Sequence, residues 1–459
     1  MDRKQIAERR WVVLGAARSG LAVARLLQDA GAGVFVSDSA PRENKAAAVA
    51  ALEQMHVPFE FGAHSSRVIK ADAMVISPGI PDSAPVVRQA IERGIMLVSE
   101  LEVSSWFCPG PIVAITGTNG KTTTTTLAGR MFEDARQPVV VGGNIDPAFA
   151  DVVRDMTARH TAVLEVSSFQ LDHVTEFRPR VAVLLNITPD HMDRYDHDFG
   201  KYTASKCRVF ARQGEGDTLI YNEDDEVTRT AVVAQAPPGV RLLPFSARTA
   251  LAEGAYLADG VLTTALHGRR TGVVAAAEIS IRGTHNLYNA MAATLAAEVM
   301  GLSPASLRAT LRDFKGVEHR LEVVRTLNGV TYINDSKATN VDAVWYALQS
   351  YDAPLVLLLG GRDKGNDYAR LEDLVRRHVK AVIAVGESAE KVRTAFAAVV
   401  PVSVATSMDQ AVSLAAAQAA RGDIVLLSPA CASFDWFENY EHRGRVFKDL
   451  VRALPGEPA

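Results

Sequence analysis

Short runs of apolar, often β-branched residues alternate along most of the chain with stretches whose apolar positions recur every three or four residues. The first run, at 11–14, is followed by a helical pattern at Leu21, Ala24 and Leu27. Strand-length runs that alternate with helix-length periodic stretches are typical of parallel α/β proteins. The pattern therefore predicts an α/β fold with strands at 11–14, 34–36, 112–115, 139–141, 162–164, 181–185, 330–333, 355–359, 381–385 and 424–427.

Two interruptions of this alternation predict three domains. Pro109-Gly110-Pro111 precedes the strand at 112–115, and such a cluster is typical of a boundary. From about 218 to 281 short apolar runs (219–221, 261–262 and 279–281) follow one another without a clear helix, which predicts an antiparallel appendage. Alternation resumes after about Gly316. We expect domains at 1–101, 102–316 and 317–459.

Composition narrows the function classes. The 459 residues carry 49 basic and 53 acidic side chains, a formal net charge of −4, so the basic excess of a nucleic-acid or anionic-membrane binder is missing. A hydrophobic content of 48% fits a globular protein. No apolar run approaches the roughly 18 residues of a membrane span. The chain length also agrees with two or three domains.

The cysteines and the first residues indicate a reducing compartment. Cys108, Cys207 and Cys431 are far apart and odd in number, which argues against a disulfide framework or a cysteine zinc site. Arg9-Arg10 before an apolar run is a weak export-signal pattern, but Arg18 breaks the apolar stretch, so a first strand is the better interpretation. We expect a cytoplasmic monomer that binds neither nucleic acid nor membrane.

The strongest chemical signal is a glycine-rich loop at 117–123, G-T-N-G-K-T-T, between an apolar strand and a helix. Its glycines let backbone N–H groups surround a phosphate, Lys121 offsets phosphate charge, and Thr122 offers a hydroxyl to Mg²⁺. Ile115 stands where the usual phosphate loop has its first glycine, so this loop is a shortened variant. The alternative, a turn with a solvated lysine, fits the strand–loop–helix setting less well.

Two further strand ends carry groups that suit a metal–phosphate site. Glu165 ends the strand at 162–164, and Asp190-His191 follows the strand at 181–185 by a few residues. Parallel strands place ligands outside their carboxyl ends, so Lys121, Glu165 and His191 are expected in one crevice. A carboxylate beside a triphosphate is a suitable oxygen ligand for Mg²⁺. Taken alone, a glutamate at a strand end is more often a solvated surface residue.

Lys206 is ambiguous from the residues alone. As part of Y-T-A-S-K at 202–206, it fits an ordinary lysine on a helix surface. A lysine cation beside Mg²⁺ would be repelled, so a metal-site role requires its charge to be removed or inverted.

The first domain has a glycine-containing loop of its own. Residues 15–20 read G-A-A-R-S-G after a strand, and Asp38 lies near the end of the second strand. This resembles a dinucleotide fingerprint, except that Ala17 replaces the glycine that permits close approach of a pyrophosphate. The pattern favours a general diphosphate cradle over NAD, although an NAD-dependent dehydrogenase stays open as an alternative from this domain alone.

Three strand ends of the last domain carry lysines and hydroxyls. They are N-D-S-K-A-T-N at 334–340, G-G-R-D-K at 360–364 and S-P-A-C-A-S at 428–433. Such groups converging at carboxyl ends predict a site for a small anionic molecule. Arg320, beside His319 near the second boundary, is placed to reach a nucleotide when domains close. Solvated loop lysines are the alternative for each stretch.

Together these stretches resemble the Mur ligases, which build the stem peptide of peptidoglycan. The phosphate loop, E-V-S-S-F-Q at 165–170 and D-H-M-D at 190–193 carry the resemblance, which extends from Gly15 to about Arg443. Residues 334–340 and 428–440 are most similar to the member that adds D-glutamate. Sister ligases tend to carry an Asp-x-Ala-His type stretch at the first position, so Lys337 and Thr339 discriminate between members.

The resemblance implies a fold and an ATP site. It implies a Rossmann-like first domain for a UDP-linked substrate, a central P-loop ATPase and a Rossmann-like last domain for the amino acid. It implies catalytic roles for Lys121, Glu165, His191 and Lys206, with a carbamoylated Lys206 joining Thr122, Glu165 and His191 around two Mg²⁺. The implied ATP contacts are Gly117, Thr118, Asn119, Gly120, Lys121, Thr122, Thr123, Asn286, Asn289, Arg320 and Asp335.

The resemblance also implies sites for the other two substrates. The UDP-sugar contacts are Arg18, Ser19, Asp38, Ser39, Gly79, Asn144, Ser167, Gln170 and His191. The D-glutamate contacts are Lys337, Thr339, Lys364, Ser433, Phe434 and Tyr440. Ala17 and Ala40 differ from residues frequent in relatives, which affects the expected uridine contacts.

We therefore expect an ATP-dependent ligase that adds D-glutamate to UDP-N-acetylmuramoyl-L-alanine through an acyl phosphate. A Mur ligase of different amino-acid specificity and a folylpolyglutamate-synthetase-like ligase are close alternatives, and a nucleotide switch protein follows from the phosphate loop alone. Phosphate release that depends on both co-substrates would distinguish a ligase from a switch.

Overall fold

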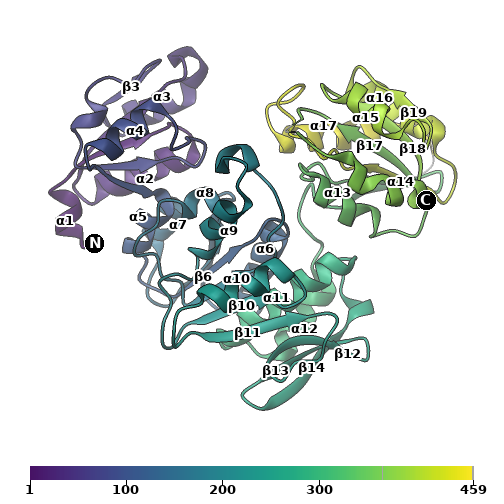
Figure 1. The fold of residues 1–459 in the computed structure, drawn as a ribbon, viewed down its shortest axis with the longest axis horizontal. Helices are drawn as coiled ribbons and strands as arrows, with labels where there is room; N and C mark the ends of the chain where they lie inside the picture. The colour runs from purple at the N-terminus through teal and green to yellow at the C-terminus, as the bar shows by residue number, and fades with distance from the viewer. Residues whose placement is uncertain (364, 457–459) are drawn as a thin grey trace. The chain divides into compact units, whose positions relative to one another are not determined.

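The computed structural model describes residues 1–363 and 365–456 and forms an α/β protein with three sheets. The chain divides into two compact units, one of residues 1–278 with 288–312 and the other of residues 279–287 with 313–459. The first unit carries two sheets and the second carries one (Figure 1). The predicted α/β fold is confirmed, whereas the predicted limits of the three domains stay a prediction.

The first sheet has five parallel strands in the order β3-β2-β1-β4-β5. Its order reverses between β1 and β4, which is where parallel sheets open a crevice for ligands. The strands are β1 (Arg10–Leu14), β2 (Gly33–Asp38), β3 (Phe59–Phe61), β4 (Ala73–Ile76) and β5 (Met96–Ser99). The helices of this region are α1 (Arg3–Ala7), α2 (Arg18–Asp29), η1 (Arg42–Lys45), α3 (Ala46–Gln54), η2 (Val68–Lys70), α4 (Pro85–Glu92) and α5 (Glu100–Phe107).

The second sheet has nine strands in the order β14-β13-β12-β11-β10-β9-β6-β8-β7. The strands are β6 (Ile112–Thr116), β7 (Val139–Gly143), β8 (Thr161–Glu165), β9 (Val181–Leu184), β10 (Thr218–Asn222), β11 (Arg241–Ser246), β12 (Gly254–Ala258), β13 (Val261–Leu266) and β14 (Arg269–Ala275). The helices are α6 (Lys121–Asp134), α7 (Phe149–Val152), η3 (Val153–Asp155), α8 (Ser168–Leu171), η4 (Met192–Tyr195), α9 (Phe199–Cys207), α10 (Glu226–Gln235), η5 (Ala276–Glu278), α11 (Thr284–Val299) and α12 (Pro304–Asp313).

The expected antiparallel appendage is smaller than the sequence pattern predicted. Within this sheet only the pairs β12–β13 and β13–β14 are antiparallel, whereas β10, β11 and β12 continue the parallel sheet (Figure 1). The helix α10, capped by the side chain of Asp225, lies between β10 and β11, where no helix was expected. Its threonines and valines gave it the composition of a strand. Residues 279–281, expected as a strand, are not in a strand.

A shared apolar core joins the first two sheets. Leu26 of α2, Leu101 of α5 and Phe149 of α7 belong to one cluster of buried residues that also includes Val13 of β1 and Leu164 of β8. Burial of this apolar surface is the main driving force that holds the two sheets in one unit.

The third sheet belongs to the second unit and has the order β15-β16-β20-β17-β18-β19. Only β15 runs antiparallel to its neighbour. The strands are β15 (Glu322–Leu327), β16 (Val330–Asn334), β17 (Leu355–Gly360), β18 (Val379–Val385), β19 (Val402–Val404) and β20 (Ile424–Leu427). The helices are α13 (Val341–Leu348), η6 (Tyr368–Leu371), α14 (Glu372–His378), α15 (Ala389–Phe396), α16 (Met408–Gln418) and α17 (Tyr440–Ala453).

No helix among the described residues is both long enough and apolar enough to cross a membrane.

Candidate active site

The glycine-rich loop connects β6 to the amino end of α6, as the sequence pattern predicted. Gly120 has φ +86°, and a Cβ there would lie 2.2 Å from the side-chain oxygen of Asn289, so only glycine fits. No side chain caps the first turn of α6. Its N–H groups and the positive end of the helix dipole can therefore receive a phosphate. Lys121 Nζ donates to the carbonyl oxygens of Gly117 (3.0 Å) and Thr118 (2.8 Å).

Neighbouring backbone and side chains fix the rest of this loop. The side-chain oxygen of Asn186 accepts the N–H of Asn119 at 2.8 Å, and Thr118 Oγ1 bonds the carbonyl oxygen of Thr188 at 3.0 Å. Asn289, which α11 carries, accepts a hydrogen bond from Thr124 Oγ1 at 3.2 Å. The predicted ATP contact Asn289 thus lies against the loop. Asn286, on the same helix, donates to the carbonyl oxygen of Arg282 at 2.7 Å.

Glu165 joins the loop to the strand beside it. At the end of β8 and only 2% exposed, it accepts a 2.6 Å hydrogen bond from Thr122 Oγ1 and a 2.8 Å bond from Asn144 Nδ2. A buried carboxylate beside a hydroxyl is an all-oxygen donor set, which suits Mg²⁺. Thr122 and Glu165, two residues of the expected metal site, are thus hydrogen-bonded to each other.

Lys206 is buried beside the loop and is not on the surface. It lies on α9 with 1% of its surface exposed, and its Nζ donates at 2.8 Å to the carbonyl oxygen of Gly117, which also accepts from Lys121. Burial, and next the charge of Lys121, lower the pKa of Lys206 well below its usual value. The ammonium form is disfavoured at this position, so Lys206 is suited to reaction as a neutral amine.

His191 follows β9 and is held by an aromatic contact. It has φ +54°, its ring meets the ring of Phe169 edge-on at 4.8 Å, and its Nε2 lies 3.6 Å from Asp190 Oδ2. Phe169 lies between the predicted UDP-sugar contacts Ser167 and Gln170, which cap α8 reciprocally. Gln170 Nε2 also donates at 3.5 Å to Glu100, a buried carboxyl that the sequence reasoning missed.

Glu100 is a buried acid that joins three segments. It accepts hydrogen bonds from the N–H of Ala150 at 2.6 Å and from Ser104 Oγ at 3.2 Å, besides the bond from Gln170. Burial raises its pKa to about 7, although these hydrogen bonds lower it. Nothing in the local sequence marks this glutamate, because its partners are up to 70 residues away.

A cavity of about 890 Å³ opens at the carboxyl ends of the first sheet. It is lined by the predicted UDP-sugar contacts Ser19, Asp38, Ser39 and Gly79. Its further lining residues include the polar side chains of His64, Ser65, Ser66 and Gln89, which the sequence reasoning missed. The first three lie a few residues after the short strand β3, which the sequence pattern did not predict, and polar residues after this short apolar run are the signal that could have identified them.

Asp38 shapes this cavity and Arg18 connects it to the second sheet. Asp38 accepts the N–H groups of Ala16 and Ala40, each at 2.8 Å. Although burial raises its pKa, these bonds and Lys45 lower it, so the carboxylate form is favoured. Arg18 Nη2 donates to the carbonyl oxygen of Asn144 at 3.5 Å. The structure therefore brings Ser19, Asp38, Ser39 and Gly79 to one cavity and places Arg18 against Asn144, all within the first unit.

In the second unit, Arg320 lies on a strained backbone segment. Its neighbours His319 and Leu321 have φ +64° and +44°. Asp335 accepts the N–H of Leu321 at 3.2 Å and Ser428 Oγ at 2.9 Å, and burial raises the pKa of Asp335 to about 6. Within the described part of the chain, Arg320 Nε is buried and has no hydrogen-bond partner. Asp335 and Arg320, two of the predicted ATP contacts, thus occur in one polar cluster, and the charge of Arg320 lowers the pKa of Asp335 against the effect of burial.

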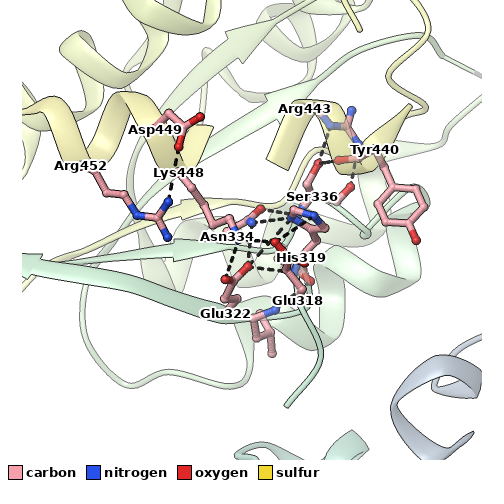
Figure 2. A network of polar contacts seen from close by, with 12 residues as sticks. Glu318, His319, Glu322, Asn334, Ser336, Tyr440, Arg443, Lys448, Asp449 and Arg452 are labelled. Carbon is pink, nitrogen blue, oxygen red and sulfur yellow. Dashed lines mark hydrogen bonds and ion pairs between the residues drawn. The ribbon is translucent and has the colours of Figure 1, made fainter. Parts of the chain in front are cut away.

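Figure 2 shows the network that fixes this segment. Glu318, His319 and Glu322 approach within 4.8 Å of one another and so resemble a cation site. Lys448 Nζ, however, contacts Glu318 at 2.5 Å and Glu322 at 2.9 Å. The lysine therefore supplies the positive charge, and Asn334 Nδ2 donates to His319 Nδ1 at 2.9 Å. This cluster is an ion-pair network and not a further metal site.

The predicted D-glutamate contacts that the structure describes also lie in the second unit. Lys337 Nζ is 5.1 Å from the ring centre of Tyr440, Ser433 is buried, and Phe434 is 61% exposed. Thr339 is half-buried. Lys364 lies outside the described residues.

Arg443, which sequence reasoning missed, connects the two loops that carry these contacts. Buried on α17, it donates to Ser336 Oγ (2.9 Å) and to the carbonyl oxygen of Ser336 (2.7 Å) (Figure 2). It also donates to the carbonyl oxygen of Cys431 at 3.0 Å. Ser336 precedes Lys337, and Cys431 lies two residues before Ser433. Arg443 thereby fixes both loops.

Three family models match successive parts of the chain. They are the Mur ligase MurD-like N-terminal domain at residues 9–99, the Mur ligase middle domain at 115–297 and the Mur ligase glutamate ligase domain at 319–431. Two similar proteins, both named UDP-N-acetylmuramoylalanine--D-glutamate ligase, come from Salinibacter ruber (48% identical) and Chloroherpeton thalassium (45% identical). Each comparison covers 99% of this chain and 100% of the relative.

Solved structures show the same fold at lower identity. A pseudomurein peptide ligase type C from Methanothermus fervidus matches 97% of this chain and 99% of its own, with a TM-score of 0.61 and 18% identity. A UDP-N-acetylmuramate-alanine ligase from Thermotoga maritima matches 97% of this chain and 100% of its own, with a TM-score of 0.61 and 16% identity. With family models matching along most of its length and relatives nearly half identical from end to end, the chain belongs to the Mur ligase family.

Proposed function

We propose that the chain is an ATP-dependent ligase that adds D-glutamate to UDP-N-acetylmuramoyl-L-alanine, a step of peptidoglycan biosynthesis. One observation carries this proposal: 48% identity to a D-glutamate ligase extends over 99% of this chain. The names of such relatives favour D-glutamate over the amino acids of sister ligases and over folate as the acceptor. The contacts described above between the phosphate loop, Thr122 and Glu165 support ATP as the energy source.

The reaction must bring two negatively charged groups into contact. The terminal carboxylate of UDP-N-acetylmuramoyl-L-alanine attacks the γ-phosphate of ATP, and ADP leaves as an acyl phosphate forms. Lys121 is assigned to the β- and γ-phosphates, where its charge offsets the repulsion and stabilises the transferring phosphoryl group. Mur ligases use ATP and Mg²⁺, and Mg²⁺ when bound supplies further positive charge to the phosphates. Thr122, Glu165 and His191 are proposed to hold Mg²⁺.

Lys206 is proposed to act as a carbamate. Its buried amine has a lowered pKa, and a neutral amine is the form that reacts with CO₂. The reaction of the neutral amine forms an N–C bond and releases one proton, so the uncharged side chain becomes an anion. An anion at this position would attract Mg²⁺, whereas an ammonium would repel it.

The amine of D-glutamate then attacks the acyl carbon, and phosphate leaves as the amide forms. Lys337, Thr339, Ser433, Phe434, Tyr440 and Lys364 are the proposed contacts of this amino acid. We assign UDP-sugar binding to domain 1–101, with Asn144, Ser167, Gln170 and His191 from the next domain. We assign ATP to domain 102–316, with Arg320 and Asp335 from domain 317–459.

Phosphate release in the presence of ATP, Mg²⁺ and UDP-N-acetylmuramoyl-L-alanine tests the proposal when the amino acid is varied. D-glutamate should give rapid release, whereas L-glutamate, alanine and lysine should give only background release. An equal response to all four amino acids would contradict the proposed specificity. Release without the UDP-linked substrate would contradict the ligase reaction itself.

A further inference from the structure

Arg194 bridges two segments of the first unit that are more than 100 residues apart in sequence. It lies in η4, three residues after His191, and its guanidinium reaches the loop that follows β4. Nη1 donates to the carbonyl oxygen of Pro78 at 3.3 Å, and Nη2 donates to that of Ile80 at 2.7 Å. The planar fork of a guanidinium holds two acceptors at once in a fixed geometry. Arg194 therefore sets where this loop lies.

The loop that Arg194 holds is a wall of the 890 Å³ cavity. Residues 78–81 all line that cavity, and two of the four are prolines, which restrict the backbone. At the start of the loop, directly before Pro78, Ser77 donates its N–H to the carbonyl oxygen of Leu14 and its hydroxyl to that of Gly15. The contacts of Ser77 and of Arg194 therefore fix the position of this wall of the cavity.

The guanidinium also packs over an aromatic ring beside His191. Its central carbon lies 4.7 Å from the ring centre of Phe169, and this ring in turn meets His191 edge-on at 4.8 Å. Cation–π and aromatic contacts of this kind favour defined orientations. One side chain thus contacts both the wall of the UDP-sugar cavity and the aromatic ring that holds His191.

The hollow that Arg194 lines is not suited to bind an anion, so anion binding does not account for the contacts of Arg194. It has a volume of about 550 Å³, and its charged lining residues are Arg88, Arg194, Lys201 and Arg208 together with Asp82, Asp172, Asp193 and Asp196. Four bases face four acids, so the hollow carries no excess of positive charge. The donors of Arg194 instead go to backbone carbonyls.

We propose that Arg194 is a positioning residue, which sets the wall at 78–81 and the ring of His191 relative to each other so that the bound UDP-sugar presents its carboxylate to ATP. This inference rests on the proposed function. Small misplacements of reacting groups cost large factors in rate, which gives a side chain remote from the reacting atoms a kinetic effect.

Kinetics of Arg194→Met test the role. We expect the KM for UDP-N-acetylmuramoyl-L-alanine to rise about tenfold and kcat to fall about tenfold, with the KM for ATP changed less than about twofold. Arg194→Lys should be intermediate, because an ammonium keeps the charge but does not hold both carbonyls in one plane. Arg88→Met is the matched control, since Arg88 lines the same hollow and its loss should leave all three constants unchanged.

A double-mutant cycle with Phe169→Leu adds a second readout. If Arg194 acts through Phe169, the double variant should be no slower than the slower single variant. Additive losses would overturn the proposal, as would Arg194→Met kinetics equal to those of Arg88→Met. An equal rise in the KM for ATP and for the UDP-linked substrate would also overturn it, because a merely structural defect has that signature.

Titration with UDP alone separates this inference from the proposed function. If the unmodified enzyme releases no phosphate with its co-substrates, the proposed function fails, yet the cavity wall can still be examined. UDP should then bind Arg194→Met about tenfold more weakly than it binds the unmodified chain. Equal affinities would overturn the positioning role.

Discussion

At the scale of single residues, Lys206 is the side chain whose chemistry most depends on burial. Lys206→Ala should lower phosphate release at least about a hundredfold, because it removes the proposed anionic group beside Mg²⁺. A small carboxylate such as formate in the assay should restore part of the rate. Lys201→Ala is a matched control on the same helix, since Lys201 is exposed and pairs with Asp196. Full unassisted activity of Lys206→Ala would contradict the metal-site role.

The raised pKa of Glu100 predicts that the free energy of unfolding depends on pH. Its pKa is raised from 4.5 to about 7, so the folded state binds its proton more tightly than the unfolded state does. The corresponding stabilisation is fully present below pH 4.5 and is lost as the pH rises through 7. Relative to Glu100→Gln, which stays neutral, the unmodified chain should lose about 3 kcal/mol of unfolding free energy between pH 4.5 and 8.

Urea unfolding at several pH values between 4.5 and 8 measures this difference. Glu43→Gln is the control, because Glu43 is exposed and its replacement should change the unfolding free energy by the same small amount at each pH. A pH-independent difference between Glu100→Gln and the unmodified chain would mean that the Glu100 carboxyl is solvated in the folded state.

At the scale of elements, the junction of β6 with α6 depends on one glycine. Gly120→Ala should raise the KM for ATP at least about tenfold, because an alanine there is forced into the left-handed region and its Cβ meets Asn289. Gly94→Ala is the matched control: Gly94 has φ +67°, but a Cβ added there would have nothing within 4 Å. It should lose about 1–2 kcal/mol of stability with an unchanged KM for ATP.

The helix α17 fixes two loops through Arg443. Arg443→Met leaves buried carbonyl oxygens of Ser336 and Cys431 without their donor, so the second unit should lose about 3 kcal/mol of unfolding free energy. Arg452→Met, on the same helix, removes an exposed pair with Asp449 and should change stability by less than about 0.5 kcal/mol (Figure 2). Equal urea midpoints for both variants would contradict the role of Arg443.

Helices and strands could be predicted from the sequence where a local pattern of apolar residues and glycines marks them. The strand, loop and helix around Lys121 follow from apolar runs and glycines, and the structure confirms them. The helix α10 was missed because its β-branched residues resemble a strand, and its stability depends on packing and on the cap by Asp225. Sequence reasoning also missed Arg194 and Arg443, because their acceptors are backbone carbonyls distant in sequence, and no local pattern marks them.

At the scale of the whole molecule, the order of three α/β segments along the chain was visible in the sequence, and each yields its own sheet. The contacts that unite the first two sheets were not visible. The shared apolar core and the bridges from Arg18 and Arg194 join residues far apart in the chain. Such contacts depend on how sheets pack, which hydrophobic periodicity alone does not specify.

The central claim is that the carboxylate of the UDP-linked substrate attacks ATP before the amide forms. Isotopic labelling of that carboxylate with ¹⁸O tests it most directly, with mass analysis of the phosphate released after addition of ATP, Mg²⁺ and D-glutamate. An acyl phosphate passes one carboxylate oxygen to phosphate, so the account predicts one ¹⁸O atom in each phosphate from fully labelled substrate. Amide product formed together with unlabelled phosphate would contradict the account.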